Sequence, residues 1–209
     1  NLDLTRVAVG DHILLGGDNM DLALAYAVTH KLMAAGTRLD PWQTRALAHG
    51  CRIAKETLLA DASLESVPVV VPSRGAKLIG GSVRTEVTRA ELLATVVEGF
   101  FPQVAVTDAP QSRARGALTQ LGLPYAQDAA ITRHLGAFLC RQREATAELN
   151  GFAPQPDDAQ FLHPTAVLFN GGAFKSNLIA ERLLDQLNAW LEADGAPPAR
   201  MLRGADLDL

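Results

Sequence analysis

The amino-acid sequence predicts an α/β fold with a mixed sheet, flanking helices and an inserted α+β segment. The first observation lies near the N-terminus, where residues 2–9 alternate apolar and polar side chains as a half-buried strand does. The second lies near the C-terminus, where the apolar run 166–169 is followed by two glycines and a helical pattern over 176–192. A strand, a tight turn and a helix in this order form the repeating unit of α/β proteins.

The predicted core sheet combines the two ends of the chain. It contains residues 2–15, residues 165–172 and the strand expected after the loop at 193–199. The predicted subdomain limits are 1–21 with 161–209 for the core and 22–160 for a smaller, inserted peripheral subdomain.

Length and composition exclude several classes of protein. A chain of 209 residues is long enough for one or two domains with a buried core. It has 19 basic and 23 acidic residues, a net charge of -4, and lacks the excess of Lys and Arg typical of nucleic-acid-binding proteins. It has no apolar run of the roughly 18–20 residues that a membrane span needs, and no signal-peptide pattern. We expect a cytoplasmic protein that binds neither nucleic acid nor a membrane.

The two cysteines, Cys51 and Cys140, each lie in an apolar helical pattern and are far apart in the chain. This spacing forms neither a disulfide framework nor a metal-binding Cys-x-x-Cys motif. We expect two buried free thiols in a reducing compartment.

Two helices are predicted in the first third of the chain. The first covers residues 20–35, with Asp18 or Asn19 as the N-cap and Gly36 as the stop. The second covers residues 41–60 and begins at an Asp-Pro pair, in which the aspartate caps the helix and the proline occupies its first position.

A β-hairpin and a capped helix follow. Residues 67–71 and 78–87 are rich in β-branched side chains and flank a Pro-Ser-Arg-Gly turn, which predicts an antiparallel pair. Thr88 and Glu91 then form a capping box before an apolar helical run.

The region before the last α/β unit is less regular. Residues 102–127 contain three prolines and two glycines and predict mixed loop and short helix. A long amphipathic helix is expected over 128–149, and the Pro- and Asp-rich segment 151–158 breaks the chain after it.

The glycine pair Gly171-Gly172 is the first candidate for chemistry. Glycines between a strand and a helix let the backbone approach a ligand closely, and the helix N-terminus then offers free N–H groups to phosphate or ribose oxygens. The alternative is a tight turn that requires positive φ. The pattern is neither the dinucleotide-binding Gly-x-Gly-x-x-Gly motif nor a phosphate-binding P-loop.

A second group of polar residues lies around another glycine pair, Gly16-Gly17. Asp11, His12, Asp18 and Asp21 crowd near it and include ligand types that metals use. Helix capping by Asp18 and a favourable first-turn charge at Asp21 explain the same residues, so we expect no metal site.

The third candidate is the segment 51–58, Cys-Arg-Ile-Ala-Lys-Glu-Thr-Leu, in the predicted second helix. Lys55 is placed to project a charge from an apolar face into a cleft. The alternative is a solvated helix face laced with charges.

The order of these segments resembles the second lobe of the nucleotide-binding domain of seventy-kilodalton heat-shock chaperones of the DnaK type. The matching elements, in chain order, are Gly-Asp-x-x-x-Leu-Gly-Gly-Asp-x-x-Asp, Cys-x-x-Ala-Lys-x-Thr-Leu, a Thr-Arg helix start, Leu-Phe-Asn-Gly-Gly-Ala-Phe-Lys and Asp206-Leu207-Asp208. This family belongs to the actin-like ATPase superfamily, so the resemblance implies a ribonuclease H-like lobe with an inserted α+β subdomain.

The resemblance also implies roles for individual residues. Lys55 matches the lysine that binds the ribose, and Gly171 and Gly172 match the turn whose backbone passes beneath the adenosine and α-phosphate. Arg52 and Glu56 stand at nucleotide-contacting positions but exchange the family's charges, since the family has Glu and Arg there.

Two further positions complete the implied nucleotide site. Lys175 follows Ala173-Phe174 where the family has Ser-Thr-Arg, with the arginine stacked on adenine, and lysine is a poorer planar stacker. Leu59 replaces a family serine, and Asp208 matches an acidic residue near the adenosine end.

The implied function is the adenosine-side half of an ATP-binding cleft that couples nucleotide state to conformation in a stress-response chaperone. ATP or ADP is the implied ligand, with Mg²⁺ in the full-length protein. Implied partners are the first lobe and a co-chaperone or peptide client.

The family holds Mg²⁺ and phosphates with a first-lobe Asp-x-Gly-Thr-Thr loop, a first-lobe lysine and a second loop, Asp-Leu-Gly-Gly-Gly-Thr. None of these occurs in residues 1–209, so the resemblance implies no catalytic or metal-binding residue in this chain and no hydrolysis by it alone. Because the chain starts at Asn1 and stops abruptly at Leu209, we expect a lobe excised from a longer protein. The alternatives are a pseudo-ATPase scaffold that has lost nucleotide dependence and a sugar-kinase relative.

Overall fold

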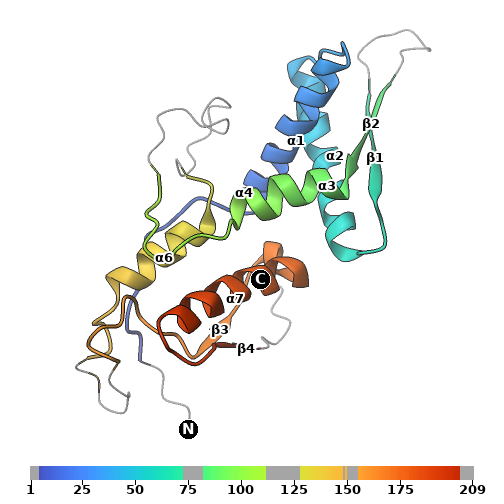
Figure 1. Cartoon of the computed structure of the whole chain (residues 1–209). Helices are drawn as coiled ribbons and strands as arrows, with labels where there is room; N and C mark the ends of the chain where they lie inside the picture. Colours follow the sequence, from blue (N-terminus) through green and yellow to red (C-terminus); the bar gives the residue numbers. More distant parts are fainter. Residues whose placement is uncertain (1–4, 73–81, 112–127, 148, 150–154, 203–209) are drawn as a thin grey trace. The chain divides into compact units, whose positions relative to one another are not determined.

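The computed structural model describes residues 5–72, 82–111, 128–147, 149 and 155–202, and shows a mixed α/β protein (Figure 1). These residues divide into two compact units. Their described parts are 5–14, 101–111, 128–147, 149 and 155–202 for unit 1, and 15–72 and 82–100 for unit 2. The chain passes between units at Leu14/Leu15 and at Phe100/Phe101. The predicted subdomain limits at 21/22 and 160/161 stay a prediction.

Unit 2 begins with two packed helices, α1 (Gly17–Ala34) and α2 (Pro41–Ala60). Both predicted helices are confirmed. Gly36, the predicted stop, lies two residues after the end of α1 and has φ 82°. α1 begins earlier than predicted because Gly16, and not Asp18 or Asn19, is its N-cap. α2 begins as predicted, since the Asp40 carboxylate accepts hydrogen bonds from two backbone N–H groups of the first turn.

The predicted hairpin forms from β1 (Ser66–Val71) and β2 (Val83–Thr88), paired antiparallel from Ser66↔Thr88 to Val71↔Val83. Residues 78–81 of the predicted second strand lie outside the described residues. Pro68, which has no N–H to donate, is tolerated because each strand of a two-stranded sheet is an edge.

The predicted capping box is confirmed at the start of α3 (Arg89–Leu92). Thr88 Oγ1 accepts from Glu91 N, and Glu91 Oε2 accepts from Thr88 N at 2.8 Å. The helical run continues through the π-helical turn η1 (Leu93–Val97) and α4 (Glu98–Phe100). The Arg89 guanidinium donates to the carbonyls of Leu64 and Leu58, so it joins this run to the end of α2.

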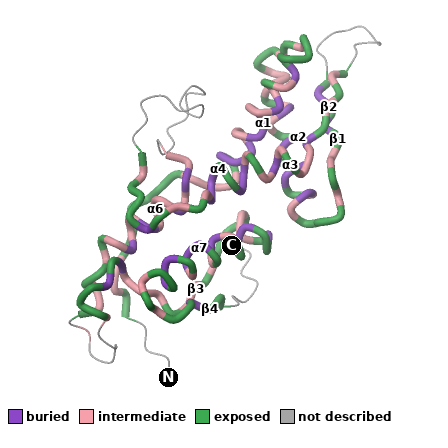
Figure 2. The backbone as a smooth tube through the Cα atoms, viewed as in Figure 1, coloured by how far each residue is buried: buried purple, intermediate pink, exposed green. Residues whose placement is uncertain are grey.

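Unit 1 contains α6 (Ile131–Arg141), β3 (Ala166–Leu168), the 3₁₀ turn η2 (Gly172–Lys175), α7 (Asn177–Ala193) and β4 (Arg200–Leu202). β3 and β4 are parallel, which confirms the predicted strand at 166–169 and the strand expected after the loop at 193–199. α7 confirms the predicted helix at 176–192. Buried residues recur along α7 (Figure 2). Three of them, Leu187, Trp190 and Leu191, form one hydrophobic core cluster with Val106, Leu139, Phe161 and Ala199.

An extended segment after Phe100 is held by side chains of α7 and α6. The Gln186 amide accepts from Val104 N at 3.0 Å and donates to Val104 O at 3.1 Å. Trp190 Nε1 also donates to Val104 O, at 2.7 Å, and Thr132 Oγ1 donates to Pro102 O at 2.9 Å. These bonds satisfy the backbone where no neighbouring strand does so.

Two predictions for unit 1 are wrong. The described part of the predicted strand 2–9, residues 5–9, forms no strand, and residues 10–15 form none either. A strand exists only with a hydrogen-bonding neighbour, and alternation of side chains does not supply one. The helix predicted over 128–149 is correct only over α6, because Asp128 lies before its first turn and ordinary turns replace it after Arg141.

Gly136, in α6, is expected to be essential for the packing of unit 1. A Cβ there would lie 2.7 Å from Val106 O, whereas a Cβ at the helical Gly99 would lie 3.8 Å from the nearest atom, Ala94 O. We expect Gly136→Ala to lower the free energy of unfolding by about 1–3 kcal/mol, the usual cost of overpacking, although alanine ordinarily favours a helix. Urea denaturation measures this, with Gly99→Ala as the control that loses no stability. A Gly136→Ala protein as stable as the wild type would contradict the packing.

Candidate functional site

Unit 2 buries an ion pair between its first two helices. Lys55 Nζ, from α2, lies 2.6 Å from Asp21 Oδ1, from α1, and donates to Gly17 O at 3.2 Å. Lys55 and Asp21 are 6% and 7% exposed, so neither charge is solvated in the ordinary way. The interpretation of Lys55 as part of a solvated helix face is therefore wrong.

Helical periodicity places Lys55 on the buried face of α2. It lies four residues after Cys51 and three before Leu58, both fully buried, so the three side chains share one stripe. Gly17 lies against the lysine head group, since a Cβ at this position would be in van der Waals contact with Lys55 Nζ, at 3.5 Å. The glycine pair at 16–17 and the lysine at 55, far apart in sequence, thus meet in one place.

Burial sets the charge states around this pair. Desolvation raises the pKa of Asp21 above its ordinary value, and the hydrogen bond and charge of Lys55 oppose that rise without cancelling it. Burial and the nearby Asp21 carboxylate raise the pKa of Cys51 to about 12, so this thiol stays protonated and unreactive. The two cysteines are free, Cys51 buried as predicted and Cys140 only partly buried.

The first turn of α1 also holds a buried polar atom without a partner. Asn19 Oδ1 accepts from Gly16 N at 2.8 Å, which fixes the amide over the start of the helix. Asn19 Nδ2 has no hydrogen-bond partner among the described residues, although the residue is 3% exposed. A buried N–H donor without an acceptor costs free energy, so such atoms often mark a position for a ligand or water. The sequence pattern indicates Asn19 only as a possible helix cap, not as a site residue.

Arg52 and Glu56 lie on the exposed face of α2. Arg52 Nε and Glu56 Oε1 are 3.1 Å apart, an i,i+4 pair in which each side chain is more than half exposed. Here the description of a charged, solvated helix face is correct. The exchange of charges at these two positions preserves an ion pair along the helix.

The second glycine pair lies in unit 1, between β3 and α7. Gly171 has φ 103°, so the tight turn with positive φ is confirmed. Gly172 has ordinary φ, and a Cβ there would meet no atom within 4 Å. Phe174 stands where the family has threonine, and its ring stacks on that of Phe169 with centroids 4.8 Å apart.

Of the two remaining predicted site residues after the glycine pair, the structure describes one. Lys175 is exposed at the end of η2, and Asp208 lies outside the described residues. Ser176, the N-cap of α7, is 8% exposed, and its Oγ has no partner among the described residues. Ser176 is not among the predicted site residues; its signal in the sequence is its place as a hydroxyl residue just before the apolar pattern of α7.

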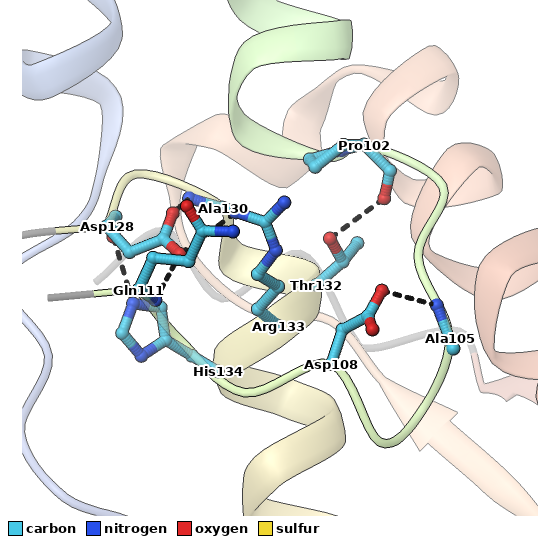
Figure 3. Close-up of polar contacts among 9 residues, drawn as sticks. All are labelled: Pro102, Ala105, Asp108, Gln111, Asp128, Ala130, Thr132, Arg133 and His134. Carbon is cyan, nitrogen blue, oxygen red and sulfur yellow. Dashed lines mark hydrogen bonds and ion pairs between the residues drawn. The ribbon is translucent and has the colours of Figure 1, made fainter. Parts of the chain in front are cut away.

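A separate polar cluster surrounds Asp128 in unit 1 (Figure 3). Its carboxylate accepts from Ala130 N at 2.9 Å, Gln111 N at 2.8 Å and Arg133 Nη1 at 3.0 Å, and its carbonyl bonds His134 Nε2. Burial alone raises the pKa of Asp128, but these three donors lower it below its ordinary value. Because the chain itself supplies these donors, the cluster is a structural clamp at the start of α6.

No metal-binding group of three or more His, Cys, Asp or Glu side chains occurs in the described part of the chain. The acidic residues near Gly16-Gly17 have other partners: Asp11 pairs with Arg141 at 3.3 Å, and Asp21 pairs with Lys55. None of the described helices is long and apolar enough to cross a membrane.

Neither a scan against protein-family models nor a search of curated proteins finds a match to this chain.

The Asp128 clamp is expected to make stability depend on pH. An acid whose pKa is lowered by folding stabilises the folded state above the unfolded pKa, near 3.8, and this contribution is lost as the pH falls through the folded value. We expect Asp128→Asn to cost about 1.5–3 kcal/mol at pH 7, with the difference from wild type shrinking below pH 3.8. Urea denaturation at several pH values measures this. The exposed Asp157→Asn is the control, and a pH-independent difference would contradict the assignment.

Proposed function

We propose that this chain is the adenosine-side half of an ATP-binding cleft in a chaperone-like ATPase of the actin-like superfamily. In this proposal, ATP or ADP binds in the full-length protein with Mg²⁺, the nucleotide state controls conformation, and the phosphate-handling residues are supplied by a first lobe. Co-chaperones or peptide clients are proposed partners, and the cytoplasm is the proposed location.

The buried Lys55 carries the proposal. Among the described residues its ammonium donates a hydrogen bond to Gly17 O and forms an ion pair with Asp21 Oδ1, whereas an ammonium has three N–H donors. A cation kept in a nearly buried position with one donor left over suits an oxygen ligand such as a ribose hydroxyl. A purely structural ion pair is the competing explanation, but buried pairs are seldom a net source of stability.

The two glycine pairs give further support. One lies at the start of α1 and the other comes shortly before α7, and a buried polar atom without a partner among the described residues lies near each helix start: Asn19 Nδ2 in the first turn of α1 and Oγ of Ser176, the N-cap of α7. Helix N-termini attract phosphate and other oxygen ligands because their first N–H groups are free. Lys55 and Gly171-Gly172 belong to different units, so each assignment is tested separately below.

One observation favours a second candidate, the pseudo-ATPase scaffold. Residues that depart from the family pattern contact one another in this chain: Arg52 pairs with Glu56, and Phe174 stacks on Phe169. Side chains occupied in this way are less free to hold an adenine. Absence of any ATP or ADP binding to the full-length protein in calorimetry would favour the scaffold and overturn the nucleotide proposal.

Replacement of Lys55 tests the ribose contact. We expect Lys55→Met to weaken ADP binding by about 1.5–3 kcal/mol, roughly 10- to 100-fold in Kd, because one hydrogen bond from a charged donor is lost. Calorimetric titration of the full-length protein measures this. Lys31→Met is the matched control, because Lys31 is also a unit 2 lysine in an ion pair, with Glu91 at 2.8 Å. Equal ADP affinity of Lys55→Met and Lys31→Met would refute the contact.

Replacement of Gly172 tests the turn in unit 1. The free protein has room for a methyl group there, so Gly172→Ala is expected to unfold at the wild-type temperature. If the backbone passes beneath the nucleotide, the added methyl group occupies ligand space and ADP affinity falls at least about 10-fold. Gly16→Ala, where a Cβ is equally unobstructed, is a control for the general effect of the substitution on stability. Wild-type ADP affinity of Gly172→Ala would place the ligand elsewhere.

A further inference from the structure

The Lys55–Asp21 pair raises the question of what the carboxylate does. The prediction of Asp21 as a first-turn charge is wrong, because α1 begins at Gly17 and Asp21 is its fifth residue; the exposed Asp18 provides the first-turn charge. Asp21 is instead 7% exposed and contacts the lysine head group at 2.6 Å. Desolvating a carboxylate is costly, so its position calls for a role that a surface aspartate would not fill.

The geometry around the ammonium supplies that role. A lysine side chain has several rotatable bonds and its head group is mobile unless two or more acceptors fix it. Gly17 O and Asp21 Oδ1 both come from the first turns of α1, and together they fix Nζ against the start of that helix. The hydrogen bond and the ion pair together restrict the head group, and they leave an N–H of the ammonium for a further acceptor.

We infer that Asp21 is a positioning residue: its carboxylate holds the Lys55 ammonium against the start of α1 and so directs a remaining N–H toward the nucleotide. This inference rests on the proposed function, because it assigns the remaining donor to the ligand. It predicts that Asp21 and Lys55 act as one element, so the loss of either has the same effect on binding as the loss of both.

The other charged groups near the pair do not replace Asp21. Arg52 on α2 and Asp18 on α1 both act on the Asp21 carboxylate, and Glu91 on α3 and Lys31 on α1 lie near enough to influence Cys51 beside it. None of these four has a hydrogen bond to Lys55 Nζ. Burial raises the pKa of Asp21, so acidification neutralises this carboxylate at a pH above 3.8, and we expect the lysine to lose its fixed position over the same range.

The test combines affinity for ADP with a readout that needs no nucleotide. Asp21→Asn, Lys55→Met and the double variant are made in the full-length protein, with Asp18→Asn as the matched control for loss of a first-turn charge. ADP affinity is measured by calorimetry. Acylation of Lys55 by acetic anhydride at neutral pH, without nucleotide, is followed by mass spectrometry, with Lys31 of the same molecule as the internal reference.

We expect Asp21→Asn, Lys55→Met and the double variant to lose ADP affinity equally, about 10-fold or more, while Asp18→Asn keeps wild-type affinity. Lys55 acylation should rise in Asp21→Asn, because the head group loses the ion pair that holds it against α1 and becomes more accessible to the reagent, and Asp21→Glu should restore its protection. If Lys55→Met loses affinity and a folded Asp21→Asn does not, the inference is overturned and the nucleotide function stands. If Lys55→Met keeps its affinity, the proposed ribose contact fails first.

A second measurement covers the case in which Asp21→Asn does not fold. In the wild-type protein without ligand, the side-chain NMR resonances of Lys55 are expected to shift together with the titration of Asp21 above pH 3.8, and ADP affinity to fall over the same range. Lys55 resonances that do not follow Asp21 would show that the carboxylate does not fix the ammonium, and would overturn the inference.

Discussion

Unit 2 buries one ammonium and one carboxylate between α1 and α2, and this ion pair constrains much of what surrounds it. Neither charge is tolerated there alone, so the start of α1 and the middle of α2 must stay in register. Gly17 lies beside the lysine head group, and a Cβ there would only reach van der Waals contact with Lys55 Nζ. The N-cap of α1, Gly16, has no side chain to cap the helix. The Asn19 side chain, in the first turn, instead accepts a hydrogen bond from Gly16 N.

Unit 1 is built on a different constraint, the hydrogen bonding of an extended backbone that has no strand beside it. Gln186 and Trp190 of α7 bind both polar groups of Val104, and Thr132 of α6 binds the carbonyl of Pro102. Side-chain amides and hydroxyls here replace the ladder of a sheet. Gly136 belongs to the same arrangement, because the absence of a side chain there lets the segment lie directly against α6.

Local signals in the sequence predict the helices and the hairpin because their causes are local. The Asp-Pro start of α2, the Thr88–Glu91 capping box and the β-branched runs of β1 and β2 act over a few residues. The strand predicted at residues 2–9 fails because pairing depends on a neighbour that alternation cannot reveal. At the candidate site, Gly171 and the i,i+4 pair of Arg52 and Glu56 were within reach of sequence reasoning. The burial of Lys55 was not, because its partner lies on another helix, far away in the chain.

The burial of Cys51 gives unit 2 an internal reporter of its own opening. This thiol is fully buried on α2 and has a pKa raised to about 12, so a thiol reagent reaches it only when the elements packed around it open. Its rate of alkylation, followed separately from that of the half-buried Cys140, therefore measures how often the packing around this face of α2 opens. Any ligand that holds α1 against α2 should lower the alkylation rate of Cys51 without contacting its sulfur.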